Sequence, residues 1–326
     1  MPQAYRYAVY LAPVGPWREL GSAWLGRDED TGRRIPRCRT DDPRLDAWTD
    51  APRHYGLHAT LKPPFRLRPG TTAAALDEAV RALARMQAPF RIALTLRALR
   101  GFLAWCLPDD AGMHARVRAL ADRMVRDLDA YRAPPTPAEI ARRRPDQLTL
   151  PQQRMLAEWG YPYVFDTFTF HITLTGQLGP TELDHAEELL RARAGRALDG
   201  AMPVEAVSVY VQPRPDDPFL AARHYHFDGS VRDAAGAGYM DDEASMSTPA
   251  RPPEGRAPSH GEDVAQRQEG TSSDAPARPS EGRAPSHGED VAQRQEGTSS
   301  DAPARPPEGC APSQGDESRG DRRVQR

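Results

Sequence analysis

The sequence predicts an α+β protein of two pseudo-symmetric lobes, each a short antiparallel sheet backed by helices, with a cleft between them. Two observations lead to this fold class. Alternating apolar residues mark strands and apolar residues at helical spacing mark helices. The order strand, helix, strand, strand also occurs twice before residue 228, so two similar lobes are the simplest arrangement.

The individual elements follow from local patterns. Strand formers that end at Pro13 indicate the first strand, and helix formers around Leu76, Val80 and Leu83 indicate the first helix. In chain order we expect a strand over 5–12, a strand over 58–65, a helix over 73–87, a hairpin of 90–99 with 101–107, a helix over 114–131, helical pieces over 134–160, a strand over 163–178, a helix over 181–194, and strands over 204–211 and 224–227.

The composition changes after Asp228, which places the domain boundary there. Residues 229–326 have few aromatic or branched apolar residues and many Pro, Gly, Ser, Glu and Arg. The segment that begins at Arg251 recurs 27 residues later at Arg278, and a shortened copy begins at Arg305. Repeats with so little to bury cannot offset chain entropy. We therefore predict a folded domain over 1–228 and a disordered tail over 229–326.

Charge and cysteine content restrict the class of function. Residues 1–228 have a net charge of +3 and the tail has −6, and such a weak positive balance argues against DNA binding. The cysteines Cys38, Cys106 and Cys310 are too far apart for a zinc knuckle or a disulfide framework. With no signal peptide pattern and no apolar stretch of membrane-spanning length, we expect a cytoplasmic monomer that uses no metal or other cofactor.

Two His-x-Thr segments carry the functional prediction. In a strand, alternate residues face opposite sides, so His58 and Thr60 share one face while their apolar neighbours share the other. His171 and Thr173 follow the same rule in the second lobe. A single strand of this kind is weak evidence for a site, because a half-buried histidine on a polar strand face is common. Two copies at matching positions of a repeated topology indicate a shared site.

Two imidazoles suit phosphodiester cleavage near neutral pH. One neutral imidazole can take a proton from the attacking water while a protonated one gives a proton to the departing oxygen. Thr60 and Thr173 can donate hydrogen bonds to the nonbridging phosphate oxygens. The catalytic pair is therefore predicted to be His58 and His171, with no metal ion.

Lys62 is a further candidate for binding the substrate. It is the only lysine of the chain, whereas the other 42 side chains in the Lys and Arg count are arginines. The two cations differ at anion sites, because lysine is a compact point charge. Strand alternation places Lys62 beside His58 and Thr60, where it could stabilise developing negative charge.

Tyr55 and Arg143 complete the set of predicted substrate-binding residues. Tyr55 directly precedes the first segment and could stack on a base or sugar, or pack in the core. Arg143 lies in the Arg142–Arg144 run between the two segments and could grip a second phosphate, or it could end a solvated helix.

At these residues the chain resembles the 2H phosphoesterase superfamily, which is named for two His-x-Thr/Ser motifs in a bilobal fold, and more closely its DUF1045 branch of phosphonate-metabolism proteins. The matching text is Tyr55-Gly56-Leu57-His58 through Phe65 and, separately, Tyr161 through Gly176, with further matches at 21–27 and 141–145, and the resemblance covers roughly residues 5–228. The resemblance implies metal-independent hydrolysis of a cyclic phosphate or 2′-linked phosphodiester, with both histidines and both threonines in the cleft, and a link to phosphonate breakdown.

Three functions follow from these observations. The first is a phosphodiesterase acting on a small ribose or nucleoside cyclic phosphate. The second is RNA end processing or 2′–5′ RNA ligation, which needs a cationic groove with stacking platforms that a net charge of +3 does not favour. The third is a non-catalytic protein that binds a cyclic nucleotide or phosphate. The expected partner is a small phosphorylated molecule, with neither DNA nor a membrane involved.

Overall fold

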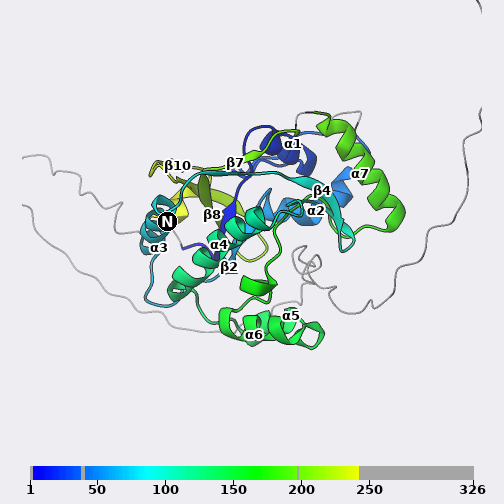
Figure 1. Ribbon diagram of the computed structural model, residues 1–326. Coiled ribbons are helices and arrows are strands. Elements are labelled where there is room, and N and C mark those ends of the chain that lie inside the picture. Colours follow the sequence, from blue (N-terminus) through cyan, green and yellow to red (C-terminus); the bar gives the residue numbers. More distant parts are fainter. Residues whose placement is uncertain (1–2, 38–40, 197, 242–326) are drawn as a thin grey trace, which may run out of the picture. The chain divides into compact units, whose positions relative to one another are not determined.

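The computed structural model describes residues 3–37, 41–196 and 198–241. Both helices and strands occur along this part of the chain (Figure 1). The elements are β1 (Arg6–Leu11), α1 (Pro16–Leu25), α2 (Leu45–Tyr55), β2 (Ala59–Phe65), α3 (Ala73–Arg85), β3 (Phe90–Ile92), β4 (Thr95–Leu99), β5 (Phe102–Cys106), α4 (Ala111–Asp127), η1 (Asp129–Tyr131), α5 (Pro137–Arg142), η2 (Pro145–Gln147), α6 (Leu150–Trp159), η3 (Phe165–Thr167), β6 (His171–Thr173), α7 (Pro180–Ala194), β7 (Met202–Val204), β8 (Ala206–Gln212), β9 (Leu220–His226), β10 (Val231–Asp233) and η4 (Ala237–Tyr239).

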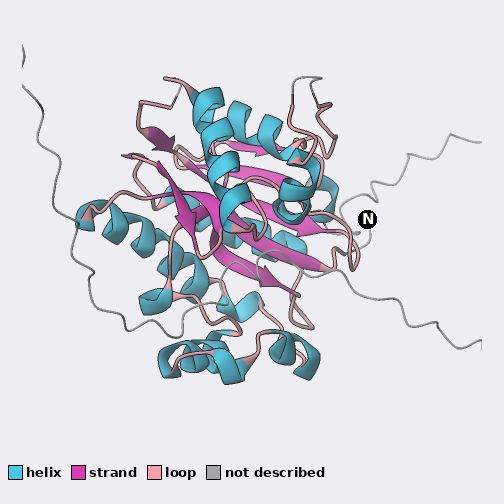
Figure 2. Ribbon diagram, turned by 90° about the vertical axis from the view of Figure 1, so that its right-hand side faces the viewer, coloured by secondary structure: helices cyan, strands magenta, loops and turns pink. Residues whose placement is uncertain are grey.

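The strands of the described residues form one antiparallel sheet of eight and a separate pair, β3 with β7. In the large sheet the order is β10-β9-β8-β1-β2-β6-β5-β4, and helices lie around it (Figure 2). The predicted α+β class is confirmed. The two expected lobes are not separate sheets, however, because β2 pairs directly with β6 and joins the halves edge to edge. The expected pseudo-symmetry is not established by this strand order.

The two faces of the large sheet differ in chemistry. On one face, Val9 of β1, Val209 of β8 and Ile172 of β6 are fully buried and belong to the main core. Apolar residues of α1, α3, α4 and α7 are part of the same core. The other face carries Tyr10 and the His-x-Thr residues, and we call it the polar face.

Local signals explain why several helices begin and end where they do. The Thr72 hydroxyl accepts a hydrogen bond from the Ala75 amide and starts α3. Thr149 and Gln152 form a reciprocal capping box at the start of α6, which ends at Gly160 in the left-handed conformation. The predicted helices over 73–87 and 181–194 correspond to α3 and α7. Three tryptophans that precede the first His-x-Thr segment, Trp17, Trp24 and Trp48, are buried.

The prediction of a strand over 163–178 is mostly wrong. Only His171–Thr173 is strand, because the chain first makes a 3-10 turn at Phe165–Thr167. The Thr167 hydroxyl donates to the carbonyl oxygens of Pro162 and Val164 at 2.7 Å and closes that turn. The predicted strand over 90–99 is also divided. Its first part, β3, pairs with β7, whereas its second part, β4, belongs to the large sheet.

The fold continues past the predicted boundary at Asp228. Val231–Asp233 adds β10 to the sheet edge, and Met240 is fully buried in the main core. Asp241 pairs with Arg223 of β9 at 2.7 Å. The predicted boundary is too early because these few apolar residues lie in a polar stretch. Residues 242–326, including the predicted disordered repeats, lie outside the described residues.

We predict that Met240→Ala lowers the free energy of unfolding by about 2–5 kcal/mol, as expected for removing a fully buried side chain. Urea denaturation of the full chain measures the change. Met86→Ala is the matched control, since Met86 is 63% exposed and its loss should cost no more than about 0.5 kcal/mol. Equal effects of the two substitutions would contradict the assignment of Met240 to the core.

Candidate active site

The pairing of β2 with β6 brings the two His-x-Thr segments together. Ala59 lies opposite Ile172 in this antiparallel pair, and both side chains are buried on the core face. Partners in an antiparallel pair run in opposite order, so His58 lies across from Thr173, and Thr60 across from His171, on the polar face. At this diagonal spacing the two histidine residues are about 7–8 Å apart, and their β-carbons are somewhat closer.

Both imidazoles are held in the same way. His58 Nδ1 lies 2.9 Å from the carbonyl oxygen of Gly56, and His171 Nδ1 lies 2.9 Å from that of Thr169. Because a carbonyl oxygen only accepts, each Nδ1 must donate its proton. In each ring Nε2 is then the nitrogen that can exchange a proton with a ligand. In each case the carbonyl group two residues upstream accepts this hydrogen bond and orients the histidine. We call this contact the clamp.

Gly56 provides the turn that makes the first clamp possible. It ends α2 with a φ of 80°, a conformation that favours glycine. A β-carbon at this position would lie 3.0 Å from Cβ of Glu29. The chain can therefore turn sharply from α2 into β2 only without a side chain here, and this turn points the Gly56 carbonyl at the imidazole.

Aromatic residues form the wall behind His58. The ring of Tyr10, on β1, stacks on the imidazole with centroids 3.7 Å apart and an interplanar angle of 20°. Tyr55 stacks on Phe219 at 5.4 Å, and both belong with Tyr10 and Tyr210 to one buried cluster. Of this group only Tyr55 was predicted at the site. Tyr10 could have been found from its place in the expected first strand, but nothing local indicated that β1 would pair with β2.

A small pocket opens between α2 and the polar face. Its lining residues are Ala51, Pro52, Tyr55, Gly56, His58, Thr173 and Thr175. The structure thus brings three of the predicted site residues, Tyr55, His58 and Thr173, to one pocket. Thr60 and His171 share the polar face with them by register and are partly exposed.

Cys106 of β5 lies directly opposite His171 of β6. Burial raises the pKa of the Cys106 thiol to about 11, so this thiol is protonated near neutral pH. Cys106 is 7% exposed. Phe102 contacts the same imidazole edge-on at 5.8 Å. His171 therefore has sulfur and aromatic neighbours instead of charged ones in this strand.

Lys62 is on the opposite face from the one expected. The β1–β2 pairing contains a register shift: Tyr10 lies opposite Thr60, but Val9 lies opposite Lys62. The extra residue in β2 is a bulge, which moves Lys62 to the core side with Val9. There the side chain is 2% exposed, and its ammonium group donates to the Val125 carbonyl of α4 at 3.0 Å and pairs with Asp129 at 3.5 Å.

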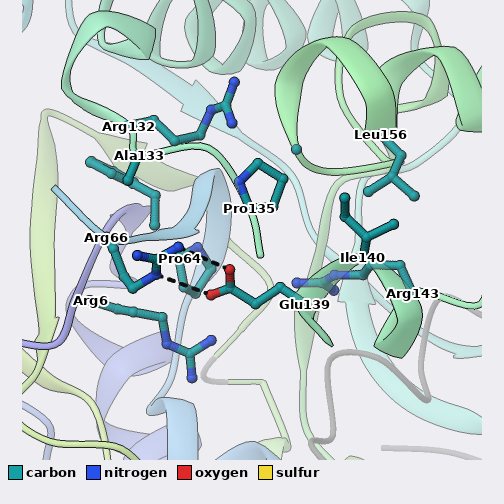
Figure 3. A pocket seen from close by; sticks show the side chains of 12 residues that line it. Arg6, Pro64, Arg66, Arg132, Ala133, Pro135, Glu139, Ile140, Arg143 and Leu156 are labelled. Carbon is teal, nitrogen blue, oxygen red and sulfur yellow. Dashed lines mark hydrogen bonds and ion pairs between the residues drawn. The ribbon is translucent and has the colours of Figure 1, made fainter. Parts of the chain in front are cut away.

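Arg143 lies at a different pocket from His58. It follows α5 and its guanidinium lies 4.6 Å from the centre of the Tyr161 ring. Arg6, Arg66 and Arg132 line the same pocket, and these arginines were not predicted as site residues (Figure 3). The described residues contain no group of three or more His, Cys, Asp or Glu side chains arranged to hold a metal ion.

Glu29 is a buried acid beside the clamp. Its side chain is 0% exposed, lies against Gly56 and Tyr210, and neither carboxyl oxygen makes a hydrogen bond. Burial raises the pKa of Glu29 to about 7, although the charge of Arg18 opposes the rise. Sequence reasoning missed this residue, because a glutamate in a charged loop gives no sign of burial.

The fold and the site together define an α+β protein with two similarly oriented histidines on the polar face of an open antiparallel sheet. Residues 60–220 match a family model described as "Protein of unknown function (DUF1045)". The match includes Thr60, Arg143, His171 and Thr173, and it begins two residues after His58.

Two curated proteins are similar to this chain. Both are named ribose 1,5-bisphosphate phosphokinase PhnN. The protein from Laribacter hongkongensis (strain HLHK9) is 38% identical over 226 residues, which are 67% of this chain and 51% of that protein. The protein from Janthinobacterium sp. (strain Marseille) is 34% identical over 234 residues, which are 69% of this chain and 51% of that protein. The chain therefore spans about half the length of the curated relatives it matches.

We predict that the ammonium of Lys62 costs stability at neutral pH. Burial lowers the pKa of Lys62 to about 8, despite the opposing charge of Asp129, while the unfolded chain keeps a value near 10.5. The folded state then binds fewer protons than the unfolded state between these values, so raising the pH through this window stabilises the fold. Lys62→Met removes the effect. The unfolding free energy of the variant minus that of the parent should fall from pH 7.5 to 10.

Glu29 should give the opposite trend. The pKa of Glu29 in the folded state lies above its ordinary value, so its protonated carboxyl group stabilises the fold at low pH. This contribution to the free energy of unfolding is lost as the pH rises from about 4.5 through about 7. Glu29→Gln removes this loss and should become more stabilising, relative to the parent, between pH 5 and 8. Chemical denaturation at a series of pH values measures both trends. A pH-independent difference for Glu29→Gln would show that this carboxyl is not buried in the native state.

Proposed function

We propose that this chain is a metal-independent phosphodiesterase that hydrolyses a small cyclic phosphate, with His58 and His171 as the general acid and base. The observation that carries the proposal is the matched pair of imidazoles on the polar face. Each is clamped at Nδ1 by the carbonyl two residues upstream, and their strands are neighbours in register. Such an arrangement suits a group held between two Nε2 atoms.

The proposed reaction needs only these side chains and water. One Nε2 removes a proton from water while its oxygen attacks phosphorus, and the other Nε2 gives a proton to the sugar oxygen as the P–O bond breaks. The product is an acyclic phosphomonoester. Thr60 and Thr173 donate hydroxyl hydrogen bonds to the nonbridging oxygens, where negative charge increases. Tyr55 contributes to the pocket wall that would face the sugar.

Lys62 is not assigned to the substrate in this mechanism. Its contacts with Val125 and Asp129 hold α4 against the core face. The resemblance to the 2H phosphoesterases supports the roles given to the two histidines and two threonines, since these four residues occupy its motif positions. Location in the cytoplasm and a monomeric state stay predictions. None of the described helices has the length and apolar character needed to cross a bilayer.

The names of the curated relatives raise a kinase as a second candidate. A P-loop kinase needs a lysine that follows glycine in the phosphate-binding loop. The only lysine of this chain, Lys62, follows Leu61 and is buried on the core face. We therefore propose that this chain corresponds to a non-kinase part of those relatives. Its relation to them would be one of neighbouring reactions on ribose phosphates, consistent with a role in phosphonate breakdown.

His58→Ala and His171→Ala should each lower kcat/KM for a cyclic phosphate by about 10²–10⁴-fold, the usual contribution of a general acid or base. Activity of the parent should survive EDTA and fall on both sides of neutral pH, because one imidazole must be neutral and the other protonated. The activity is measured by phosphorus NMR of the products formed from ribose 1,2-cyclic phosphate and from 2′,3′-cyclic nucleotides.

His114→Ala is the matched control, since this histidine lies at the exposed start of α4. Retained activity in either active-site variant would refute the mechanism. Stable binding of a cyclic nucleotide without turnover would instead favour a non-catalytic binding protein. Salt-sensitive binding of oligoribonucleotides with cleavage or joining of RNA ends would favour the RNA-processing alternative.

A further inference from the structure

Glu29 is a buried acid that the proposed reaction does not yet use. Its side chain is 0% exposed, and neither carboxyl oxygen has a hydrogen-bond partner among the described residues. Burying an ionisable group without hydrogen bonds costs stability, and such groups are concentrated at functional sites. The part of the proposed site that lies against Glu29 is Gly56, whose carbonyl group is the clamp of His58.

The loop that carries Glu29 is fixed on both sides of this residue. Arg18 of α1 donates to the carboxyl groups of Asp28 and Asp30, at 2.8 and 2.7 Å. The carbonyl oxygen of Glu29 itself accepts a hydrogen bond from the Ala221 amide at 3.0 Å. Turning the Glu29 carboxyl group out to solvent would break these contacts. The structure therefore holds this acid in the interior.

The path from Glu29 to His58 is short and passes through Gly56. A β-carbon at Gly56 would lie 3.0 Å from Cβ of Glu29, and the Gly56 carbonyl oxygen is 2.9 Å from Nδ1 of His58. With the bond lengths between these atoms added, Cβ of Glu29 lies within about 10 Å of that Nδ1. Because the two side chains are 0% and 8% exposed, salt and water screen their interaction little.

Three tyrosine rings lie around His58. The ring centroids of Tyr55 and Tyr210 are 6.4 and 6.3 Å from the centroid of the imidazole, and Tyr10 stacks on it at 3.7 Å. Burial and the charge of Glu29 raise the pKa of Tyr210, so this hydroxyl group stays neutral. The face of an aromatic ring attracts a cation. The Tyr10 ring and an ionised Glu29 therefore both favour a positive charge on His58.

Other charges also act on Glu29. The guanidinium groups of Arg18 and Arg27 attract its negative charge, and the buried Arg27 donates to two backbone carbonyl oxygens. The carboxyl groups of Asp28 and Asp30 repel it. All four groups are present whether or not residue 29 is charged. A neutral substitution of Glu29 thus measures the effect of this one carboxylate on the site.

His171 has positive charge on its side of the sheet instead. Cys106 lies opposite it, and the charges of Arg97 in β4 and Arg100 in the next turn oppose the rise that burial causes in the pKa of this thiol. Arg97 also pairs with Asp109 at 3.4 Å, which weakens its effect. Positive charge nearby disfavours an imidazolium. The two histidines therefore share the clamp but differ in their electrostatic surroundings.

We propose that Glu29 is a positioning residue whose negative charge stabilises the protonated form of His58, so that His58 is the general acid and His171 the general base. This inference rests on the proposed phosphodiesterase function. Nε2 of His171 takes a proton from water as the water oxygen attacks phosphorus. Nε2 of His58 gives its proton to the sugar oxygen as the P–O bond breaks. Exchange with solvent then returns a proton to His58 and removes one from His171.

The test is the pH profile of kcat/KM on a 2′,3′-cyclic nucleotide. Burial raises the pKa of Glu29 to about 7, so its charge is present on the alkaline side of the profile. A unit charge about 10 Å away in a protein shifts a proton equilibrium by about one pH unit. In Glu29→Gln the alkaline limb should therefore move down by about one pH unit, which lowers kcat/KM about 10-fold on that limb. The acid limb should keep its place.

Two control variants separate the charge from other effects. Glu29→Asp keeps the carboxylate and should keep the alkaline limb near that of the parent. Glu19→Gln removes an exposed negative charge from the first turn of α1 and should leave both limbs unchanged. An unchanged profile in Glu29→Gln would overturn the inference while leaving the phosphodiesterase intact. Movement of the acid limb in place of the alkaline limb would also overturn it, because His58 would then be the base.

A second measurement does not depend on turnover. If no cyclic phosphate is hydrolysed, the proposed function is wrong, and proton NMR of the histidine rings then tests the action of Glu29. The His58 ring signal should change over a pH range about one unit lower in Glu29→Gln than in the parent, whereas the His171 signal should keep its range. Equal ranges for His58 in parent and variant, with thermal unfolding showing both folded, would refute the role of Glu29.

Discussion

The antiparallel pairing of β2 with β6 is the constraint on which the candidate site depends. Ala59 and Ile172 face each other in the core, and this one buried contact fixes which residues of the two segments face the other side. A shift of one residue in either strand would move its histidine and threonine into the core. The burial of small and branched apolar side chains thus stabilises the arrangement that places the polar ones on the other face.

Around this pairing, a backbone carbonyl group restrains each imidazole. The carbonyl groups of Gly56 and Thr169 select the tautomer, and the Tyr10 ring restricts rotation of His58. Restraints of this kind reduce the reorganisation needed when charge moves during a reaction. Glu29 lies on the far side of Gly56, so any charge it acquires is placed behind the clamp.

Two groups of polar side chains lie at opposite ends of β2 on the polar face. The histidines and threonines lie where β2 begins, and the pocket lined by Arg6, Arg66, Arg132 and Arg143 lies where it ends. Lys62, between them in sequence, is removed to the core side by the bulge. Lys62 therefore offers no charge to a ligand on the polar face.

Much of this protein was determined by local sequence alone. Periodic apolar residues predict the helices α3 and α7 and the strands β1, β2 and β5 nearly at their observed bounds, and alternation places each histidine on the same face as its threonine. These features need only residues close in sequence, because the periods of helix and strand are local. The shared face of His58 and Thr60 therefore depends on nothing outside its own strand.

Tertiary structure decided the rest. Three features depend on segments that are distant in sequence. These are the joining of the two expected lobes in one sheet, the position of Tyr10 behind His58 and the burial of Glu29. Lys62 is the clearest case: alternation predicts the polar face, but a bulge against β1 turns the side chain to α4. A bulge is set by the pairing of two strands, and no periodicity within one strand can reveal it.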